Sequence, residues 1–244
     1  MSLYNRFLIL ALLSLSLLTL CVSCNKTSNE TAPHIIYILA DDLGYGDISA
    51  MNPDAAWDTR HIDQIAREGI RFTDAHTGSA VCSPTRYGVL TGRYSWRTRL
   101  KQGVLWSWDP PLIQQQETTV GSFLQEQGYT TACVGKWHLG YGTTGKLEEY
   151  TGTIKPGPLE LGFDYHFGVP QNHGDKMGVF IENDHIYGIR SEKIEPYSRT
   201  FYGPQYYGFD APQRKNIECM EMLTEKTLDW LSLQSSEDPF FLYF

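Results

Sequence analysis

Short apolar runs alternate with amphipathic segments along most of this chain, and the alternation limits its possible folds. Apolar runs of strand length occur at residues 34–40, 129–134 and 240–244. Apolar side chains with the spacing of a helix face occur at residues 62–69, 118–128 and 220–231. Thr118 or Thr119 suits the start of the second helix, and Gly128 suits its end. Strands and helices in alternation predict an α/β domain with a mainly parallel sheet flanked by helices.

The middle and the end of the chain fit this scheme less simply. Residues 141–213 are rich in Gly, Pro, Tyr and charged residues and show no clear period, so we expect long loops over the sheet edge. The last apolar run stops at Phe244, in the middle of what resembles a buried strand. A buried strand needs other elements packed on both faces of its sheet. We therefore expect an N-terminal part of a larger protein, truncated at Phe244.

The charge balance excludes one class of partner. The chain has 20 Lys and Arg against 28 Asp and Glu, a formal net charge of -8. An acidic chain gains little from the counterion release that drives binding to phosphate backbones. Nucleic acid is therefore not an expected partner, and any anionic substrate must be held by a local site.

The first 33 residues have the pattern of an export signal followed by a tether. Arg6 precedes an apolar run that is too short to span a bilayer comfortably, so residues 1–23 are predicted to be a signal peptide. The small residues before Cys24 resemble a bacterial lipobox, with Cys24 as the lipidated residue and residues 24–33 as a polar tether. Plain cleavage and release of a soluble periplasmic protein is the alternative. Either way we expect an exported protein of the periplasm, outer membrane or cell surface, with no membrane contact except a lipid anchor.

Two adjacent carboxylates follow the first predicted strand. In open α/β sheets ligands bind beyond the carboxyl ends of the strands, so Asp41 and Asp42 are well placed to bind a hard divalent cation. The alternative is that Asp-Asp-Leu-Gly simply forms a turn.

A cysteine precedes a short predicted helix. Ser83 suits the N-cap and Pro84 the first helical position, with Gly92 at the helix end, so Cys82 is expected at a helix N-terminus. Unpaired amides there favour an anion, whether a thiolate or a bound oxyanion, and Arg86 adds a positive charge. The alternative is a buried, inert cysteine.

The strand at 129–134 runs on into Lys136, Trp137 and His138. Extended alternation predicts that Lys136 and His138 point to one side and Trp137 to the other. An ammonium group can hold a tetrahedral anion while an imidazole transfers protons. The alternative is a solvated strand end.

Three segments together resemble a known enzyme family. Cys82, Pro84, Arg86, Thr91 and Gly92 are spaced as in the signature of the type I, formylglycine-dependent sulfatases. Residues 128–140 are similar to that family's second signature, and residues 41–46 to its first metal-binding segment. Residues 62–63, 68–70 and 72–75 also follow the family's pattern, although Arg60 and His61 stand where Pro-Asn is usual. The resemblance implies an alkaline-phosphatase-like fold and a sulfatase catalytic domain over residues 34–244, incomplete at its C-terminus.

The resemblance also implies a modified nucleophile and a metal ion. Cys82 would be oxidised by a formylglycine-generating enzyme to formylglycine, whose hydrate attacks sulfur and then expels sulfate from a covalent intermediate. Asp41, Asp42 and the modified Cys82 would bind the cation, expected to be Ca²⁺ with Mg²⁺ as the alternative. The family's other metal ligands come from segments further along the chain, so the set here is short and this chain alone is expected to be inactive.

Four more residues receive roles from the resemblance. Arg86 would stabilise the formylglycine, Lys136 would bind a sulfate oxygen, and His138 would position and deprotonate the hydrate. Residues 168–173 resemble a family segment that brings a polar residue to the substrate, here Asn172, although a loop amide bonded to its own backbone is the alternative.

These observations lead to an expected function with two alternatives. We expect an arylsulfatase-like sulfuric ester hydrolase that acts on aryl or carbohydrate sulfates. One alternative is a phosphate or phosphonate ester hydrolase of the same superfamily, and the other is a non-catalytic lipoprotein that binds sulfated glycans. Several aromatic residues near the signatures are candidates either for stacking on sugar or aryl rings or for core packing and loop anchoring. They are Trp96, Trp106, Trp108 and Tyr141.

Overall fold

A computed structural model of the chain describes residues 32–197 and 206–244. Residues 33–244 form one compact unit. The predicted signal peptide, Cys24 and most of the predicted tether lie outside the described residues. Within the described ranges, no helix combines the length and the apolar character needed to cross a membrane.

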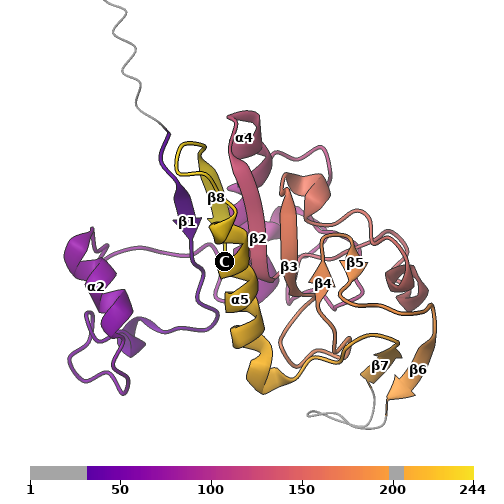
Figure 1. The fold of residues 1–244 in the computed structure, drawn as a ribbon. Helices are drawn as coiled ribbons and strands as arrows, with labels where there is room; N and C mark the ends of the chain where they lie inside the picture. The colour runs from indigo at the N-terminus through magenta and orange to yellow at the C-terminus, as the bar shows by residue number, and fades with distance from the viewer. Residues whose placement is uncertain (1–31, 198–205) are drawn as a thin grey trace, which may run out of the picture. The chain divides into compact units, whose positions relative to one another are not determined.

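A six-stranded sheet forms the centre of this unit, with the strand order β1-β8-β2-β3-β4-β5 (Figure 1). The strands, in that order, are β1 (Ile35–Tyr37), β8 (Phe240–Tyr243), β2 (Thr130–Lys136), β3 (Tyr165–Val169), β4 (Ile181–Glu182) and β5 (His185–Ile186). The first four strands are parallel to one another, and β4 and β5 are added antiparallel. A separate antiparallel ribbon joins β6 (Ile194–Tyr197) and β7 (Tyr206–Phe209). The prediction of an α/β domain with a mainly parallel sheet is confirmed.

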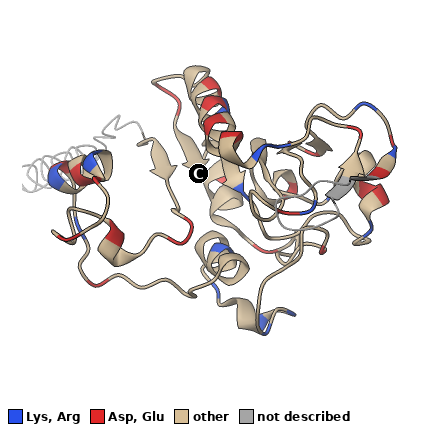
Figure 2. Cartoon of the chain, turned by 90° about the horizontal axis from the view of Figure 1, so that it is seen from below, with Lys and Arg blue, Asp and Glu red and all other residues tan. Residues whose placement is uncertain are grey.

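The helices match the predicted segments closely. They are α2 (Arg60–Glu68), α3 (Cys82–Thr91), α4 (Val120–Glu126) and α5 (Cys219–Ser232). Short 3-10 turns occur at Tyr45–Asp47, Ser95–Arg97, Leu147–Thr151, Leu159–Leu161 and Asn216–Glu218. Thr119 caps α4 by accepting a hydrogen bond from the Ser122 amide, as predicted for this position. Figure 2 shows acidic residues along α5, and Glu221, Glu225 and Asp229 of this helix are exposed.

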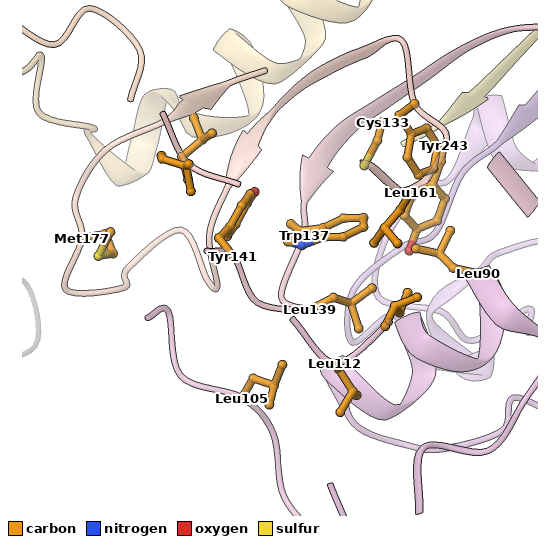
Figure 3. Close-up of a cluster of buried hydrophobic side chains, with 14 of the residues drawn as sticks. Leu90, Leu105, Leu112, Cys133, Trp137, Leu139, Tyr141, Leu161, Met177 and Tyr243 are labelled. Atoms are coloured by element: carbon orange, nitrogen blue, oxygen red, sulfur yellow. The ribbon is translucent and has the colours of Figure 1, made fainter. Parts of the chain in front are cut away.

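Successive side chains of β2 point to opposite faces of the sheet, and both sets pack against helices. Cys133 packs in a cluster with Tyr87 and Leu90 of α3. Ala132 and Val134 pack in a second cluster with residues of α5, among them Leu223 and Trp230. Figure 3 shows Trp137, which is fully buried, inside the first cluster. Burial on both faces fixes the position of β2, whose carboxyl end carries Lys136.

Two expectations about the sheet are wrong. Residues 141–213, expected to be loops only, contain β3 to β7, and β3 is an interior strand of the sheet. Residues 34–40 were expected to be a buried strand, but only Ile35–Tyr37 are a strand, and this strand, β1, is at the sheet edge with Ile36 50% exposed. The final run is an interior strand, because β8 pairs with β1 on one side and β2 on the other.

One glycine permits the close contact between β2 and β3. Gly135 pairs with Gly168 in the parallel register of these strands. A Cβ atom on Gly168 would lie 1.9 Å from the Gly135 carbonyl oxygen, which is a severe overlap. Only glycine fits at this position, so the two strands can deliver their carboxyl ends side by side.

Candidate active site

A pocket of about 750 Å³ lies at the carboxyl ends of the parallel strands. Its lining includes Asp41 and Asp42 after β1, Lys136 at the end of β2, and Asn172 after β3. Arg86 of α3 also lines it. Parallel strands place their carboxyl ends at one edge of a sheet, which is where open α/β folds bind ligands. The topology therefore brings five of the residues singled out in the sequence to one place.

Cys82 is the first residue of α3, because the helix begins two residues earlier than the sequence predicts. The N-cap is Val81, whose carbonyl oxygen accepts the first helical hydrogen bond from the Thr85 amide at 3.1 Å. The predicted Ser83 N-cap is wrong, because the Ser83 side chain is buried and instead accepts a hydrogen bond from the Leu105 amide. Pro84 is tolerated here because amides of the first turn have no helical partner.

Lys136 lies between the cysteine and the first carboxylate. Its Nζ atom is 3.0 Å from Cys82 Sγ and donates to Asp41 Oδ2 at 2.7 Å. Only 10% of the Lys136 side chain is exposed, so its charge is screened little by solvent. The ammonium group therefore places a fixed positive charge at the N-terminus of α3, directly beside the cysteine sulfur.

Arg86 and Asp41 complete this charge cluster. The Arg86 guanidinium is buried, donates to the Lys136 carbonyl oxygen, and lies 3.7 Å from Asp41 Oδ1. Burial raises the pKa of Asp41, but the hydrogen bond from Lys136 and the charges of Lys136 and Arg86 outweigh it, and the net pKa lies below its ordinary value. Asp41 is therefore ionised at neutral pH and leaves one net positive charge among these three residues.

His138 adjoins the cluster as a neutral base. Its backbone φ of 55° ends the extended alternation on which its predicted direction rested. Its Nε2 atom lies 2.7 Å from the Leu105 carbonyl oxygen, which only accepts, so Nε2 carries the proton. Burial and the nearby charges of Lys136 and Arg86 lower the pKa of His138 to about 4. The Nδ1 atom is buried without a partner and is available to accept a proton.

The carboxylates suit a hard cation in type but not in number. Asp41 and Asp42 both line the pocket, and Asp42 has a left-handed backbone with φ of 61°. Calcium takes about six to eight oxygen ligands. Among residues 32–197 and 206–244, no group of three or more His, Cys, Asp or Glu side chains is arranged to hold a metal. In this chain the Asp41 carboxylate is instead bonded to Lys136.

A buried ion pair, which the sequence does not reveal, holds the loop that carries Asn172. Arg214 lies 3.2 Å from Asp175, and both side chains are almost fully buried. Arg214 also donates to the carbonyl oxygens of Asn172, His173 and Val179. Because these carbonyls belong to the loop after β3, the pair fixes the backbone on which Asn172 faces the pocket.

The three described cysteines differ in their surroundings. Cys82, Cys133 and Cys219 are all free thiols. Burial raises the pKa of Cys133 to about 12 and also raises the pKa of Cys219. Cys82 is only partly buried and lies beside Lys136. Of these thiols, Cys82 has the access and the positive neighbour that a reactive position requires.

Comparisons with known proteins agree on one family. The sequence profile described as Sulfatase matches residues 33–244. The chain is 40% identical over 178 residues to the N-acetylgalactosamine-6-O-sulfatase of Bacteroides thetaiotaomicron, an alignment that covers 72% of this chain and 34% of that protein. It is 39% identical over 160 residues to human arylsulfatase G, covering 64% of this chain and 27% of that protein.

A solved structure supports the same assignment. A B. thetaiotaomicron sulfatase structure from work on the metabolism of multiple glycosaminoglycans superposes with a TM-score of 0.78 at 30% identity. The superposition covers 87% of this chain and 50% of that one. The chain thus spans about a third of the length of the first curated relatives and half of this structure. The fold, the motifs and a family match over nearly all of its described residues agree, and the chain belongs to the sulfatase family.

Proposed function

We propose that this chain contributes the nucleophile and the sulfate-binding side of a site that hydrolyses aryl or carbohydrate sulfate esters. One observation carries the proposal: the Lys136 ammonium group lies within 3.0 Å of Cys82 Sγ, next to ionised Asp41. A cation beside a nucleophile position can hold an oxyanion where bonds to it are made and broken. The named sulfatase relatives give the chemistry of the anion, a sulfate ester.

The residues of the cluster divide the reaction between them. Formylglycine formed from Cys82 would supply a hydrated carbonyl as the nucleophile. Lys136 holds a sulfate oxygen next to position 82, and Arg86 fixes the end of β2 through the Lys136 carbonyl oxygen while adding positive charge. Asn172, which also lines the pocket, offers a polar side chain to the substrate.

His138 is the proton acceptor in this scheme. Its protonated Nε2 is held by the Leu105 carbonyl oxygen, which leaves Nδ1 to take a proton. Because its pKa lies near 4, the imidazole is neutral and ready to act as a base at neutral pH. The Leu105 carbonyl also stabilises the imidazolium that forms.

Asp41 and Asp42 are proposed ligands of a divalent cation, with Ca²⁺ ahead of Mg²⁺. Carboxylate oxygens are the donors that both ions prefer, and when bound the ion would add positive charge at the sulfate group. The described residues supply fewer donors than calcium takes. We therefore propose that the 244 residues by themselves show no turnover, which a sulfate-release assay on protein with oxidised Cys82 checks. Clear turnover would contradict this.

Export and maturation complete the proposal. The apolar segment at residues 1–23 and Cys24 support an exported protein of the periplasm or cell surface, with a lipid anchor at Cys24. A formylglycine-generating enzyme would act on Cys82 during maturation.

The direct test is mass spectrometry of the tryptic peptide 72–86 from protein made together with a formylglycine-generating enzyme. We expect a peptide lighter by the exchange of SH and H for a carbonyl oxygen, and reactive with an aldehyde probe. Peptides with Cys133 and Cys219 should keep their thiols and serve as internal controls. An unmodified Cys82 would leave the site without its nucleophile and would favour a phosphate-type hydrolase or a glycan-binding protein.

A further inference from the structure

Two tryptophans stand side by side at the pocket. The rings of Trp106 and Trp108 are stacked, with centroids 5.8 Å apart and planes 7° apart. Both residues line the pocket that contains Arg86 and Lys136. Trp106 is 61% exposed, so a large apolar surface is open to solvent in a pocket that also contains charged residues. An exposed indole backed by a second indole is a flat surface on which a ring can stack.

The loop that carries these rings is anchored to the catalytic cluster. The Leu105 amide donates to Ser83 Oγ, next to Cys82, and the Leu105 carbonyl oxygen holds His138. Asp109 accepts from the Trp106 amide at 2.7 Å, and Tyr150 donates to the Ser107 carbonyl oxygen at 2.9 Å. Trp106 is therefore presented on a fixed backbone, which lowers the entropy cost of stacking a ligand on it.

The wall next to the tryptophans is polar. Ser107 Oγ donates to Gln171 Oε1 at 2.8 Å, which joins the tryptophan loop to the loop after β3. Gln171, Asn172 and Lys176 line the pocket, and the buried pair of Asp175 and Arg214 holds their backbone. A pyranose ring has an apolar C–H face and an edge of hydroxyl groups, so it matches an aromatic surface with amides beside it. A plain aryl ring would leave the amides unused.

We propose that Trp106, backed by Trp108, is the stacking subsite for the sugar ring of a carbohydrate sulfate ester. The proposal rests on the proposed function, because it places the sulfate group at Lys136 and the ring that carries it on Trp106. In this proposal Trp106 helps the protein to distinguish sugar sulfates from aryl sulfates. Lys136 recognises the anion in either case, whereas Trp106 recognises the ring.

Calorimetric titration of the purified protein with three probes tests the subsite. The probes are sodium sulfate, N-acetylgalactosamine 6-sulfate and 4-nitrophenyl sulfate. We expect the sugar sulfate to bind more tightly than inorganic sulfate. Trp106→Ala should weaken sugar sulfate binding by about three- to tenfold and leave inorganic sulfate binding unchanged. Trp106→Phe should recover most of the loss, because it restores an aromatic face.

Trp96 provides a matched control. It is 54% exposed and stacks on Tyr94, but it does not line this pocket. Trp96→Ala should leave all three affinities unchanged. The proposal is overturned if Trp106→Ala weakens the sugar sulfate no more than Trp96→Ala does, or if it weakens only the aryl sulfate. Failure of the proposed function has another pattern, since neither inorganic sulfate nor either ester would then bind the wild-type protein.

Discussion

Ser83 accepts a hydrogen bond from the Leu105 amide at 3.1 Å, and this contact ties the helix that begins at Cys82 to the residue that orients His138. The Ser83 side chain is fully buried. The nucleophile position and the base are therefore held at a fixed separation by one short chain of hydrogen bonds. Residue 83 therefore links α3 to the loop that holds His138.

Ser83→Ala tests this contact. The substitution leaves the buried Leu105 amide without an acceptor, which should lower the free energy of unfolding by about 1–3 kcal/mol. Urea unfolding measures the change. Ser232 is a matched control, because it is exposed and its hydroxyl bonds only the Asp229 carbonyl oxygen at the end of α5. A loss no larger for Ser83→Ala than for Ser232→Ala would contradict the account.

Arg214→Met tests the ion pair under the loop of Asn172. The change leaves the buried Asp175 carboxylate without its cation and three loop carbonyls without a donor, so we expect a loss of roughly 3–5 kcal/mol in the free energy of unfolding. The pair of Arg190 and Asp210, which is far more exposed than that of Arg214 and Asp175, provides the comparison. Arg190→Met should leave the urea midpoint almost unchanged. Equal effects of the two substitutions would show that the buried pair has no special role.

Buried histidines should make the protein sensitive to mild acid. Burial lowers the pKa of both His138 and His166 to about 4, from an ordinary value of 6.5. Between these values the unfolded chain binds protons that the folded chain does not. Stability from these groups is therefore complete above pH 6.5 and declines as the pH falls towards 4. The expected result is a urea midpoint that drops steadily through this window.

The variant His166→Gln separates the effect of histidine protonation on stability from the effect of side-chain packing. His166 lies between the Tyr141 hydroxyl and the Cys133 carbonyl oxygen, away from the pocket lining. His166→Gln should lower stability at every pH but reduce the slope below pH 6.5, because one titrating group is gone. His61→Gln, at an exposed position, should keep the wild-type slope. An unchanged slope in His166→Gln would disprove the assignment.

Much of the fold could be predicted because the relevant signals are local. The apolar runs and helix faces of residues 62–69, 118–128 and 220–231 became α2, α4 and α5. Strand β3 was missed because its five residues lie among glycines and prolines and are stabilised by pairing with β2, which a local pattern does not contain. Exposure of β1 depends on its place at the sheet edge, which is equally non-local.

In the site, too, local sequence signals predicted some residues, whereas non-local contacts could not be predicted. Strand ends and motifs indicated Asp41, Cys82, Arg86 and Lys136, and the structure brings these four together. The groups that hold them were not predictable, because a backbone carbonyl such as that of Leu105 has no sequence signal. Arg214 reaches Asp175 from a distant segment, and neither stands in a recognisable motif.

We propose that Lys136 binds the sulfate oxyanion beside position 82, and calorimetric titration with sodium sulfate measures this binding. Lys136→Met removes a charge-assisted hydrogen bond, so the dissociation constant for sulfate should rise by about ten- to a hundredfold. Lys101→Met, at an exposed lysine that bonds the Trp96 carbonyl oxygen, should bind sulfate like the wild type. If Lys136→Met also binds sulfate as tightly as the wild type, the oxyanion site lies elsewhere and the account is wrong.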